Sequence, residues 1–161
     1  MQSTMKRQRR SQHGVYAMEW AIVFPVFFML VYACVSYGLT FLVRQSMQNA
    51  VEDGARAALQ YQEQRLDRLS FASLVAKERL SWLPNGLTPV IDVSVCRVGS
   101  AQSCATSTPC SSQWANRCLV RVEASLAYGL APLAPPLPGL GVLVPDVLTA
   151  SASMLVDPGG F

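Results

Sequence analysis

The chain has 161 residues, 51% of them hydrophobic and 14% charged, with a formal net charge of +3 at pH 7. This length allows one modest domain and argues against a large enzyme core, and the charged fraction is well below the roughly 25% of an average soluble domain. The positive charge gathers in the first ten residues, at Lys6, Arg7, Arg9 and Arg10. Basic and acidic residues nearly balance in the rest of the chain, so we expect no basic face for nucleic acid on the folded part.

A long run without charged residues extends from Trp20 to Val43, 24 residues in all. Because an α-helix rises ~1.5 Å per residue, such a run crosses a ~30 Å hydrocarbon core with some tilt to spare. We therefore predict a transmembrane helix over residues 15–43, in which Pro25 causes at most a mild kink. The basic residues before it predict a cytoplasmic N-terminus and a periplasmic region after Val43, in a single-pass protein of the bacterial inner membrane.

The junction between the basic leader, residues 1–14, and the apolar run carries the most specific pattern. Cleavage after Gly14 would make Val15 the first residue of the mature chain and Glu19 the fifth, which is the arrangement of a prepilin. Gly14 suits the cut because a residue without a side chain lets a peptidase approach the backbone closely. Glu19 needs a partner, since a charge at mid-bilayer costs ~2.5 to 3.5 kcal/mol on insertion scales. In a filament the new amine of a neighbouring subunit can pair with this carboxylate; in the plainer alternative Glu19 is an interfacial residue that reaches toward water.

Two other interpretations of the N-terminus fit less well. A secretory signal has an apolar core of about 7 to 15 residues before its cut site, and Ser36-Tyr37-Gly38 would have to serve as that site. The apolar run is longer than this and continues to Val43. A lipoprotein would use Cys34 as its lipidated residue, but Tyr32 is too large for the small residue usual at that position. We interpret Cys34 as a helix-packing residue, because free cysteine behaves as a small hydrophobe.

Residues 44–82 favour a periplasmic helical extension. They contain no proline and only one glycine, Gly54. They carry an approximate apolar stripe, formed by Met47, Val51, Ala55, Ala58, Leu66, Leu69, Leu74 and Val75. We expect the membrane helix to continue outward as one stalk until Trp82-Leu83-Pro84-Asn85-Gly86 ends it. An earlier break, around Gln60 to Gln64, stays open.

Two blocks in this part of the chain carry a family pattern. The first, His13 to Pro25, has Gly, four residues, Glu, an aromatic residue and then an aliphatic run with Pro; the second, Val43 to Ala58, is a helical extension that ends in Gly-Ala-Arg. In both, the chain resembles the TadE-like minor pilins of the tight-adherence (Flp) type IV pilus system. The resemblance implies a minor pilin or pseudopilin that serves initiation, tip or assembly of the pilus. It also implies partners: a prepilin peptidase, other pilins or pseudopilins, and an ATPase-driven assembly platform in the inner membrane.

Three later segments alternate apolar and polar residues, the pattern of half-buried strands. Their apolar positions are Ile91, Val93 and Val95 in the first, Val120, Val122, Ala124, Leu126 and Tyr128 in the second, and Leu148, Ala150, Ala152, Met154 and Val156 in the third. A sheet must bury its apolar face against another element, and the outer part of the long helix is available. We therefore predict a pilin-like α+β fold, with one long N-terminal transmembrane and stalk helix packed on a small antiparallel sheet of about three strands. Residues 83–161 form this β-rich domain, with a proline-rich irregular loop over residues 131–145.

Four cysteines lie in the exported part, Cys96, Cys104, Cys110 and Cys118, where an oxidising compartment allows disulfides. Their spacing is not of the CxxC type and no histidine follows His13, so we expect no metal site. Four cysteines allow three pairings. Matching the apolar faces of the first two strands leaves Cys96 and Cys118 on opposite sheet faces, which argues against a direct bond between them. Of the two remaining pairings, we prefer Cys96 with Cys104 and Cys110 with Cys118.

The sequence contains few of the residue patterns expected of an enzyme. The sole histidine precedes the proposed cut, and no phosphate-binding glycine loop or spaced metal set is present. Asp92, Arg121 and Glu123 alternate on a strand face that we expect to be solvated. We therefore expect no catalysis, no cofactor and no small-molecule substrate.

The main alternative function is a single-pass envelope sensor or assembly factor that is never cleaved. Such a protein would bind another envelope protein through its periplasmic domain, while Glu19 simply lies at the membrane interface. It shares the predicted topology with the pilin and differs in processing. A mature N-terminus at Val15 favours the pilin, and an intact Met1 favours the uncleaved anchor.

Overall fold

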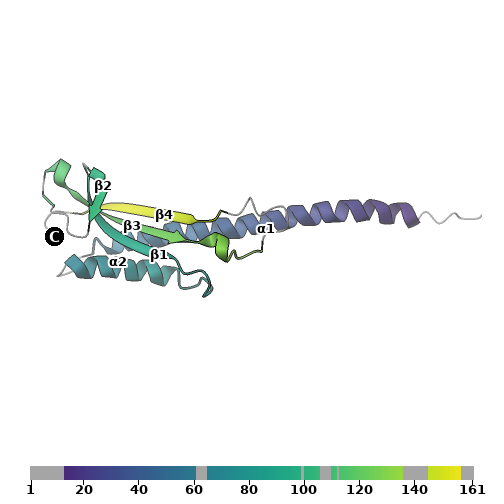
Figure 1. The fold of residues 1–161 in the computed structure, drawn as a ribbon, viewed down its shortest axis with the longest axis horizontal. Coiled ribbons are helices and arrows are strands. Elements are labelled where there is room, and N and C mark those ends of the chain that lie inside the picture. Colours follow the sequence, from purple (N-terminus) through teal and green to yellow (C-terminus); the bar gives the residue numbers. More distant parts are fainter. Residues whose placement is uncertain are drawn as a thin grey trace, which may run out of the picture. The chain divides into compact units, whose positions relative to one another are not determined.

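A computed structural model describes residues 13–60, 65–98, 100–105, 110–111, 113–135 and 145–156 of the chain. Within these ranges the chain forms two α-helices, four strands and two short 3-10 helices (Figure 1). In chain order they are α1 (His13–Ala57), α2 (Arg65–Arg79), β1 (Val90–Arg97), β2 (Ser100–Ala105), η1 (Trp114–Asn116), β3 (Cys118–Leu126), η2 (Tyr128–Leu130) and β4 (Leu148–Val156). The chain divides into two compact units, Met1–Tyr37 and Gly38–Phe161, and α1 contributes to both.

In the first unit, α1 carries large apolar side chains around its whole circumference. Those exposed include Tyr16, Met18, Trp20, Ile22, Val23, Phe24, Val26, Phe27, Phe28, Met29, Leu30, Val31 and Val35. The helix continues past Pro25, as predicted for a membrane helix. A helix that is hydrophobic all round belongs in a membrane or inside a bundle, because none of its faces favours water. In the part of the chain that the structure describes, α1 is the one helix long and apolar enough to cross a membrane, which makes it a candidate membrane anchor.

In the second unit, the single stalk expected beyond Val43 is replaced by two helices. α1 ends at Ala57 and α2 begins at Arg65, so the break falls at the earlier of the two positions considered. After the break α2 packs closely on α1 at Gly54, where an added Cβ would lie 3.0 Å from the Ala72 carbonyl oxygen and 3.1 Å from the Ala76 Cβ. Three small residues thus let α2 pack directly on α1. A straight stalk would leave the apolar face of α2 in water.

Two polar contacts show how α1 and α2 are oriented relative to each other. The Arg79 Nε lies 3.0 Å from a carboxylate oxygen of Asp53, and the Trp82 Nε1 donates a hydrogen bond of 2.9 Å to the Ser46 hydroxyl. Later residues of the α2 region therefore contact earlier residues of α1. The outer part of α1 and α2 form an antiparallel hairpin.

The four strands form one antiparallel sheet in the order β2-β1-β3-β4. The central register pairs Val95 with Val120 and Val120 with Met154, so the apolar positions of β1, β3 and β4 share one face. This face packs on α1 and α2, and the buried cluster includes Val43, Met47, Ala50, Val51, Leu69, Ala72, Val95, Val120, Val122, Ala124 and Leu126. The α+β fold and the inward positions of the three expected strands are confirmed.

Strand β2 is an addition to the prediction. Its sequence, Ser-Ala-Gln-Ser-Cys-Ala, lacks the apolar alternation that identifies a half-buried strand. It pairs with the end of β1, where Cys96 lies directly opposite Cys104. The sheet therefore has four strands where about three were predicted.

Tyr128 lies just beyond β3, in η2, and its side chain is buried. The Thr40 hydroxyl of α1 donates a hydrogen bond of 3.4 Å to the Tyr128 hydroxyl oxygen, which also accepts one of 3.3 Å from the Leu133 backbone N–H. These bonds join the start of α1 in the second unit to the chain that follows β3. Of the proline-rich loop predicted over residues 131–145, residues 136–144 lie outside the described ranges.

Strand β4 is an edge strand of the described sheet, because it pairs with β3 alone. The Gln48 side-chain amide of α1 donates a hydrogen bond of 3.5 Å to the Ser151 carbonyl oxygen. A side chain from the helix thus contacts the backbone of this edge strand.

Candidate functional site

The residues predicted for the leader junction fall at the start of α1. Lys6, Arg7, Arg9 and Arg10 lie outside the described residues. Gly14 and Val15 belong to the first turn of α1, which begins at His13, and only their backbone is described. Glu19 follows Val15 by one turn, about 6 Å along the helix axis. Its side chain is exposed.

Glu19 has no ion-pair partner among the residues whose side chains the structure describes. Its helix neighbours at three and four residues' distance are Val15, Tyr16, Ile22 and Val23, none of them basic. The next basic residue along α1 is Arg44, about 37 Å away at 1.5 Å per residue. Within one helical turn of Glu19, α1 therefore offers no lysine or arginine that could pair with this carboxylate.

A row of aromatic side chains with a spacing of four residues passes beside Glu19. It comprises Tyr16, Trp20, Phe24, Phe28 and Tyr32. The ring centroids of Phe24 and Phe28 are 6.4 Å apart, and so are those of Phe28 and Tyr32. Residues four apart form the helix ridge that fits the grooves of a second helix in the commonest packing class. The sequence analysis did not single out this row, although its four-residue period is visible in the sequence.

A comparison with protein families matches residues 14–56 to the family described as TadE-like protein. Residues 14–56 are TadE-like. The TadE-like segment begins at Gly14 and lies wholly within α1 (His13–Ala57), so it contains Gly14, Val15 and Glu19 and none of the sheet. The resemblance predicted from the sequence is confirmed for this segment. No curated protein and no solved structure gives a significant match to the chain.

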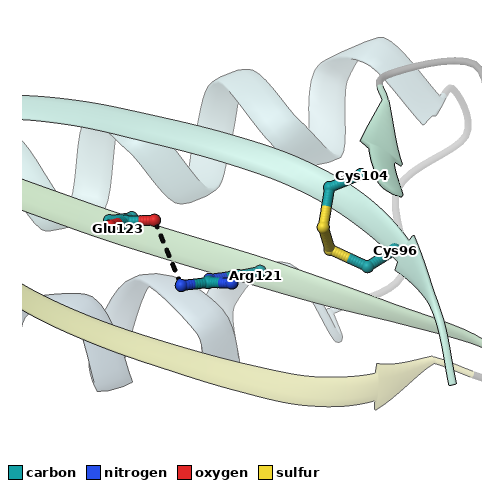
Figure 2. The surroundings of a disulfide bond; sticks show 4 residues. All are labelled: Cys96, Cys104, Arg121 and Glu123. Atoms are coloured by element: carbon teal, nitrogen blue, oxygen red, sulfur yellow. Dashed lines mark ion pairs between the residues drawn. A yellow bond between two sulfur atoms is a disulfide. The ribbon is translucent and has the colours of Figure 1, made fainter. Parts of the chain in front are cut away.

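The four cysteines of the second unit form two disulfides, and the pairing is the one that the sequence analysis preferred. Cys96 in β1 is bonded to Cys104 in β2, with 4.2 Å between their Cα atoms (Figure 2). Cys110 is bonded to Cys118, the first residue of β3, with 5.5 Å between their Cα atoms. In the register of the sheet, Cys96 is opposite Leu119, the residue next to Cys118, so the two cysteines point to opposite faces. Cys34 is free and exposed.

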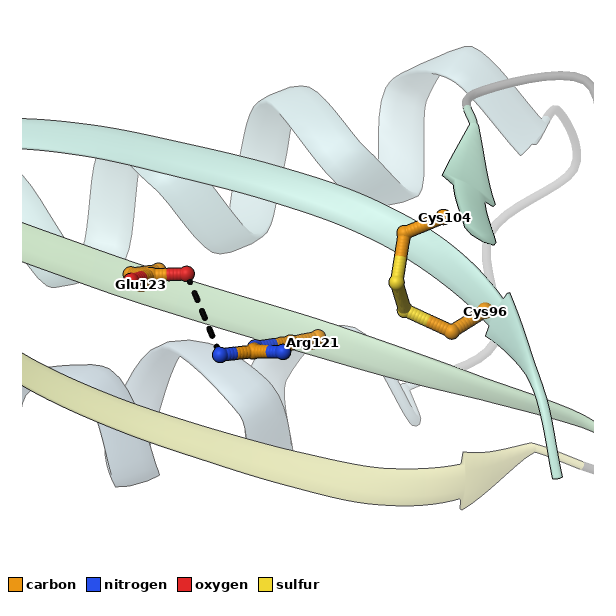
Figure 3. Close-up of polar contacts among 4 residues, drawn as sticks. All are labelled: Cys96, Cys104, Arg121 and Glu123. Atoms are coloured by element: carbon orange, nitrogen blue, oxygen red, sulfur yellow. Dashed lines mark ion pairs between the residues drawn. A yellow bond between two sulfur atoms is a disulfide. The ribbon is translucent and has the colours of Figure 1, made fainter. Parts of the chain in front are cut away.

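The outer face of the sheet, opposite the helices, is polar. Arg121 and Glu123 on β3 form an ion pair of 3.3 Å between Nη2 and Oε2, and both side chains are partly exposed (Figure 3). A shallow depression beside them is lined by Cys96, Leu119, Arg121, Ser151, Ala152 and Ser153. An exposed pair of this kind contributes only ~0 to 1 kcal/mol to stability. Within the described ranges, no group of three His, Cys, Asp or Glu side chains is arranged to hold a metal ion.

Proposed function

We propose that the protein is a minor pilin or pseudopilin of the tight-adherence type IV pilus system, made as a precursor and cut by a prepilin peptidase between Gly14 and Val15. The TadE-like match supports a protein associated with this pilus system. The finer role rests on one observation about the matched segment. The segment begins at Gly14, and five residues later it contains Glu19, whose carboxylate has no ion-pair partner among the described side chains of α1.

Processing requires access to the Gly14–Val15 bond, which lies in the first turn of α1. A peptidase binds its substrate in an extended form, so this turn has to unwind. The cost is small, because the first N–H groups of a helix have no intrahelical acceptor and helix ends open with little free energy. The glycine lowers it further, since glycine disfavours the helix by about 1 kcal/mol relative to alanine.

After the cut, Val15 carries a free amine one turn before Glu19. In our proposal this amine pairs with the Glu19 carboxylate of a neighbouring subunit, and the pair fixes how far one helix is shifted along the next. An ion pair in a water-poor environment is far stronger than one on a surface, whereas an unpartnered carboxylate there is costly. The requirement for a partner therefore favours assembly over isolated helices.

The proposed topology places the leader in the cytoplasm, α1 across the inner membrane and the sheet domain in the periplasm. Two observations support it: the basic cluster precedes the span, and the two disulfides belong to the region after it. We propose a structural role in the pilus machinery, with the assembly platform and other pilins as partners. Catalysis, a cofactor and a small-molecule substrate have no part in this proposal.

The N-terminal sequence of the protein purified from membranes tests the proposal. We expect Val15 as the first residue, and an uncleaved precursor when Gly14 is replaced, as in Gly14→Val. Gly38→Val is a matched control on the same helix, because a Cβ at Gly38 meets nothing within 4 Å. An intact Met1 in the unaltered protein would instead support an uncleaved envelope anchor.

A further inference from the structure

The turn that joins α2 to β1 in the second unit contains the dipeptide Asn85-Gly86. The Leu87 N–H donates a hydrogen bond of 2.8 Å to the Pro84 carbonyl oxygen, which closes a β-turn. Asn85 and Gly86 are the two central residues of this turn, and both are exposed. Leu83 and Leu87, which flank it, are buried. The turn therefore presents the dipeptide to water while its two ends are fixed in the core.

The reactivity of this dipeptide depends on two groups, the Asn85 side-chain amide and the Gly86 backbone nitrogen. Attack of that nitrogen on the amide carbon closes a five-membered ring, and intramolecular reactions are fast when the two groups can meet. In the part of the chain that the structure describes, neither group has a hydrogen-bond partner. Glycine also has no side chain that could obstruct the attack. Neither hydrogen bonding nor steric hindrance therefore protects Asn85.

The other two asparagines of the chain are in different surroundings. Asn49 lies inside α1, where the N–H of the following residue belongs to the helical hydrogen-bond ladder. Asn116 lies in η1, and the Arg117 N–H after it donates a hydrogen bond of 3.3 Å to the Trp114 carbonyl oxygen. In both cases the nitrogen that would attack is already engaged, and its residue carries a side chain. Asn85 differs from both in each respect.

We propose that Asn85 is a site of spontaneous deamidation. The Gly86 nitrogen bonds to the Asn85 Cγ and loses its proton to water, while the Cγ–Nδ2 bond breaks and the side-chain nitrogen leaves as ammonia. Water then opens the resulting succinimide at one of its two carbonyl carbons, which gives aspartate or isoaspartate. The net reaction consumes one water and releases one ammonia. It needs neither the membrane nor the pilus, so it is independent of the proposed function.

Both products change the turn between α2 and β1. Each carries a carboxylate in place of a neutral amide, in a hollow that Lys77 also lines. Isoaspartate in addition leads the main chain through the Cβ atom, which inserts a methylene between Pro84 and Leu87, the acceptor and donor residues of the 2.8 Å hydrogen bond. We expect this hydrogen bond to weaken and the turn to open more often.

The test is peptide mass spectrometry of the full-length protein in detergent, incubated for days at mildly alkaline pH. After reduction and alkylation, trypsin places the three asparagines in separate peptides, residues 45–56, 80–97 and 98–117. Deamidation raises the mass of a peptide because –NH2 becomes –OH, and methyl transfer by an isoaspartyl methyltransferase identifies isoaspartate. An unincubated sample, digested in parallel, gives the background.

Gly86→Ala is the matched variant. The φ angle of Gly86 lies outside the left-handed region, and an added Cβ would meet the Ala131 Cβ at 3.8 Å, an ordinary contact. Alanine therefore fits the turn, while its methyl group obstructs the attack of the nitrogen. We expect this variant to keep the thermal unfolding temperature of the unaltered protein and to deamidate several-fold more slowly. An equal rate in both proteins would overturn the inference.

In the unaltered protein we expect peptide 80–97 to deamidate several-fold faster than the other two, at a rate close to that of the protein unfolded in guanidinium chloride. Deamidation of this peptide in the unfolded protein alone would overturn the inference, because the fold would then protect Asn85. Hydrogen exchange tests the consequence: the Leu87 amide should exchange several-fold faster in incubated unaltered protein than in incubated Gly86→Ala. Isoaspartate with unchanged exchange at Leu87 would refute the predicted opening of the turn.

Discussion

Gly54 of α1 and Ala72 of α2 bring two helix backbones together where no side chain fits between them. An added Cβ on Gly54 would lie 3.0 Å from the Ala72 carbonyl oxygen, an atom that cannot move aside without moving α2. The helical hairpin of the second unit therefore depends on the absence of a side chain at Gly54. The contact also explains why a glycine is present three residues before the end of α1, in a helix segment that otherwise favours alanine and larger residues.

We expect Gly54→Leu to lower the free energy of unfolding of the exported unit by about 1 to 3 kcal/mol, because it overpacks the contact between α1 and α2. Denaturant titration of the detergent-solubilised protein, followed by the fluorescence of Trp82 and Trp114, measures this change. Gly38→Leu on the same helix should be close to neutral, since no atom lies within 4 Å of its added Cβ. Equal stability of the two variants would contradict the tight hairpin.

We expect Glu19→Ala to leave membrane insertion intact and to impair assembly. Removing a charge near the membrane core favours insertion, while it removes the partner proposed for the amine of the next subunit. Carbonate extraction measures insertion, and immunoblotting of sheared surface pili measures assembly.

Glu52→Ala is the control for this prediction. Glu52 also lies on α1 and within the TadE-like segment, but its carboxylate already accepts a hydrogen bond of 3.0 Å from the Gln48 side chain of the same helix. Unaltered piliation in Glu19→Ala, or an equal loss in both variants, would count against a special role for Glu19.

Replacing each cysteine of the Cys110–Cys118 bond by serine should lower the free energy of unfolding by different amounts. Either change opens the same disulfide, at a cost of about 2 to 3 kcal/mol from the released loop. Cys118 is buried on the inner face of the sheet and Cys110 is only half-buried, so Cys118→Ser also places a hydroxyl in the core. We expect the free energy of unfolding of Cys118→Ser to fall by a further ~1 to 3 kcal/mol, about the penalty for burying an unsatisfied hydroxyl.

Thermal unfolding of the two serine variants without reductant, so that the Cys96–Cys104 bond stays closed in both, measures this difference. Cys110→Ser should unfold at a lower temperature than the unaltered protein, and Cys118→Ser at a lower temperature than Cys110→Ser. The same stability for both would show that the Cys118 side chain is not in the core.

Tyr128→Phe should destabilise the exported unit more than Thr40→Val does. The Tyr128 hydroxyl oxygen accepts hydrogen bonds from both Thr40 and the Leu133 backbone, whereas Thr40→Val removes only one of the two. Each lost bond costs about 0.5 to 1.5 kcal/mol, and a donor left buried without an acceptor costs more. A double-mutant cycle by denaturant titration gives the coupling between positions 40 and 128, and a coupling of zero would contradict the bond.

The strands could be predicted because one face of the sheet is buried and the other is exposed to solvent. Val120, Val122 and Ala124 alternate with Leu119, Arg121 and Glu123, and a period of two has no other simple explanation. The same alternation placed Cys96 and Cys118 on opposite faces, which argued against a bond between these two cysteines and left two of the three pairings open. Strand β2 has no such pattern, because it lies at the sheet edge and is held by the Cys96–Cys104 bond.

The packing of α2 back against α1 could not be predicted from local sequence patterns. No proline marks the end of α1, and Gly54, Ala72 and Ala76 are compatible with a straight helix as well as with a tight helix pair. Only the packed structure shows that they meet. In the candidate site, the spacing of Gly14 and Glu19 could be recognised in the sequence, whereas a partner for Glu19 stays a prediction, because the described side chains include none that pairs with it.

The hydrogen bond from Gln48 to the Ser151 carbonyl has a bearing on how copies of this protein can meet. An open strand edge invites pairing with the same edge of another molecule, and proteins suppress such pairing by covering the edge. Because Gln48 contacts the backbone of β4, a strand that adds to this edge has to displace a hydrogen bond from the helix. In the proposed pilin, polymerisation would then rest on contacts between helices and on the membrane machinery, and not on concentration alone.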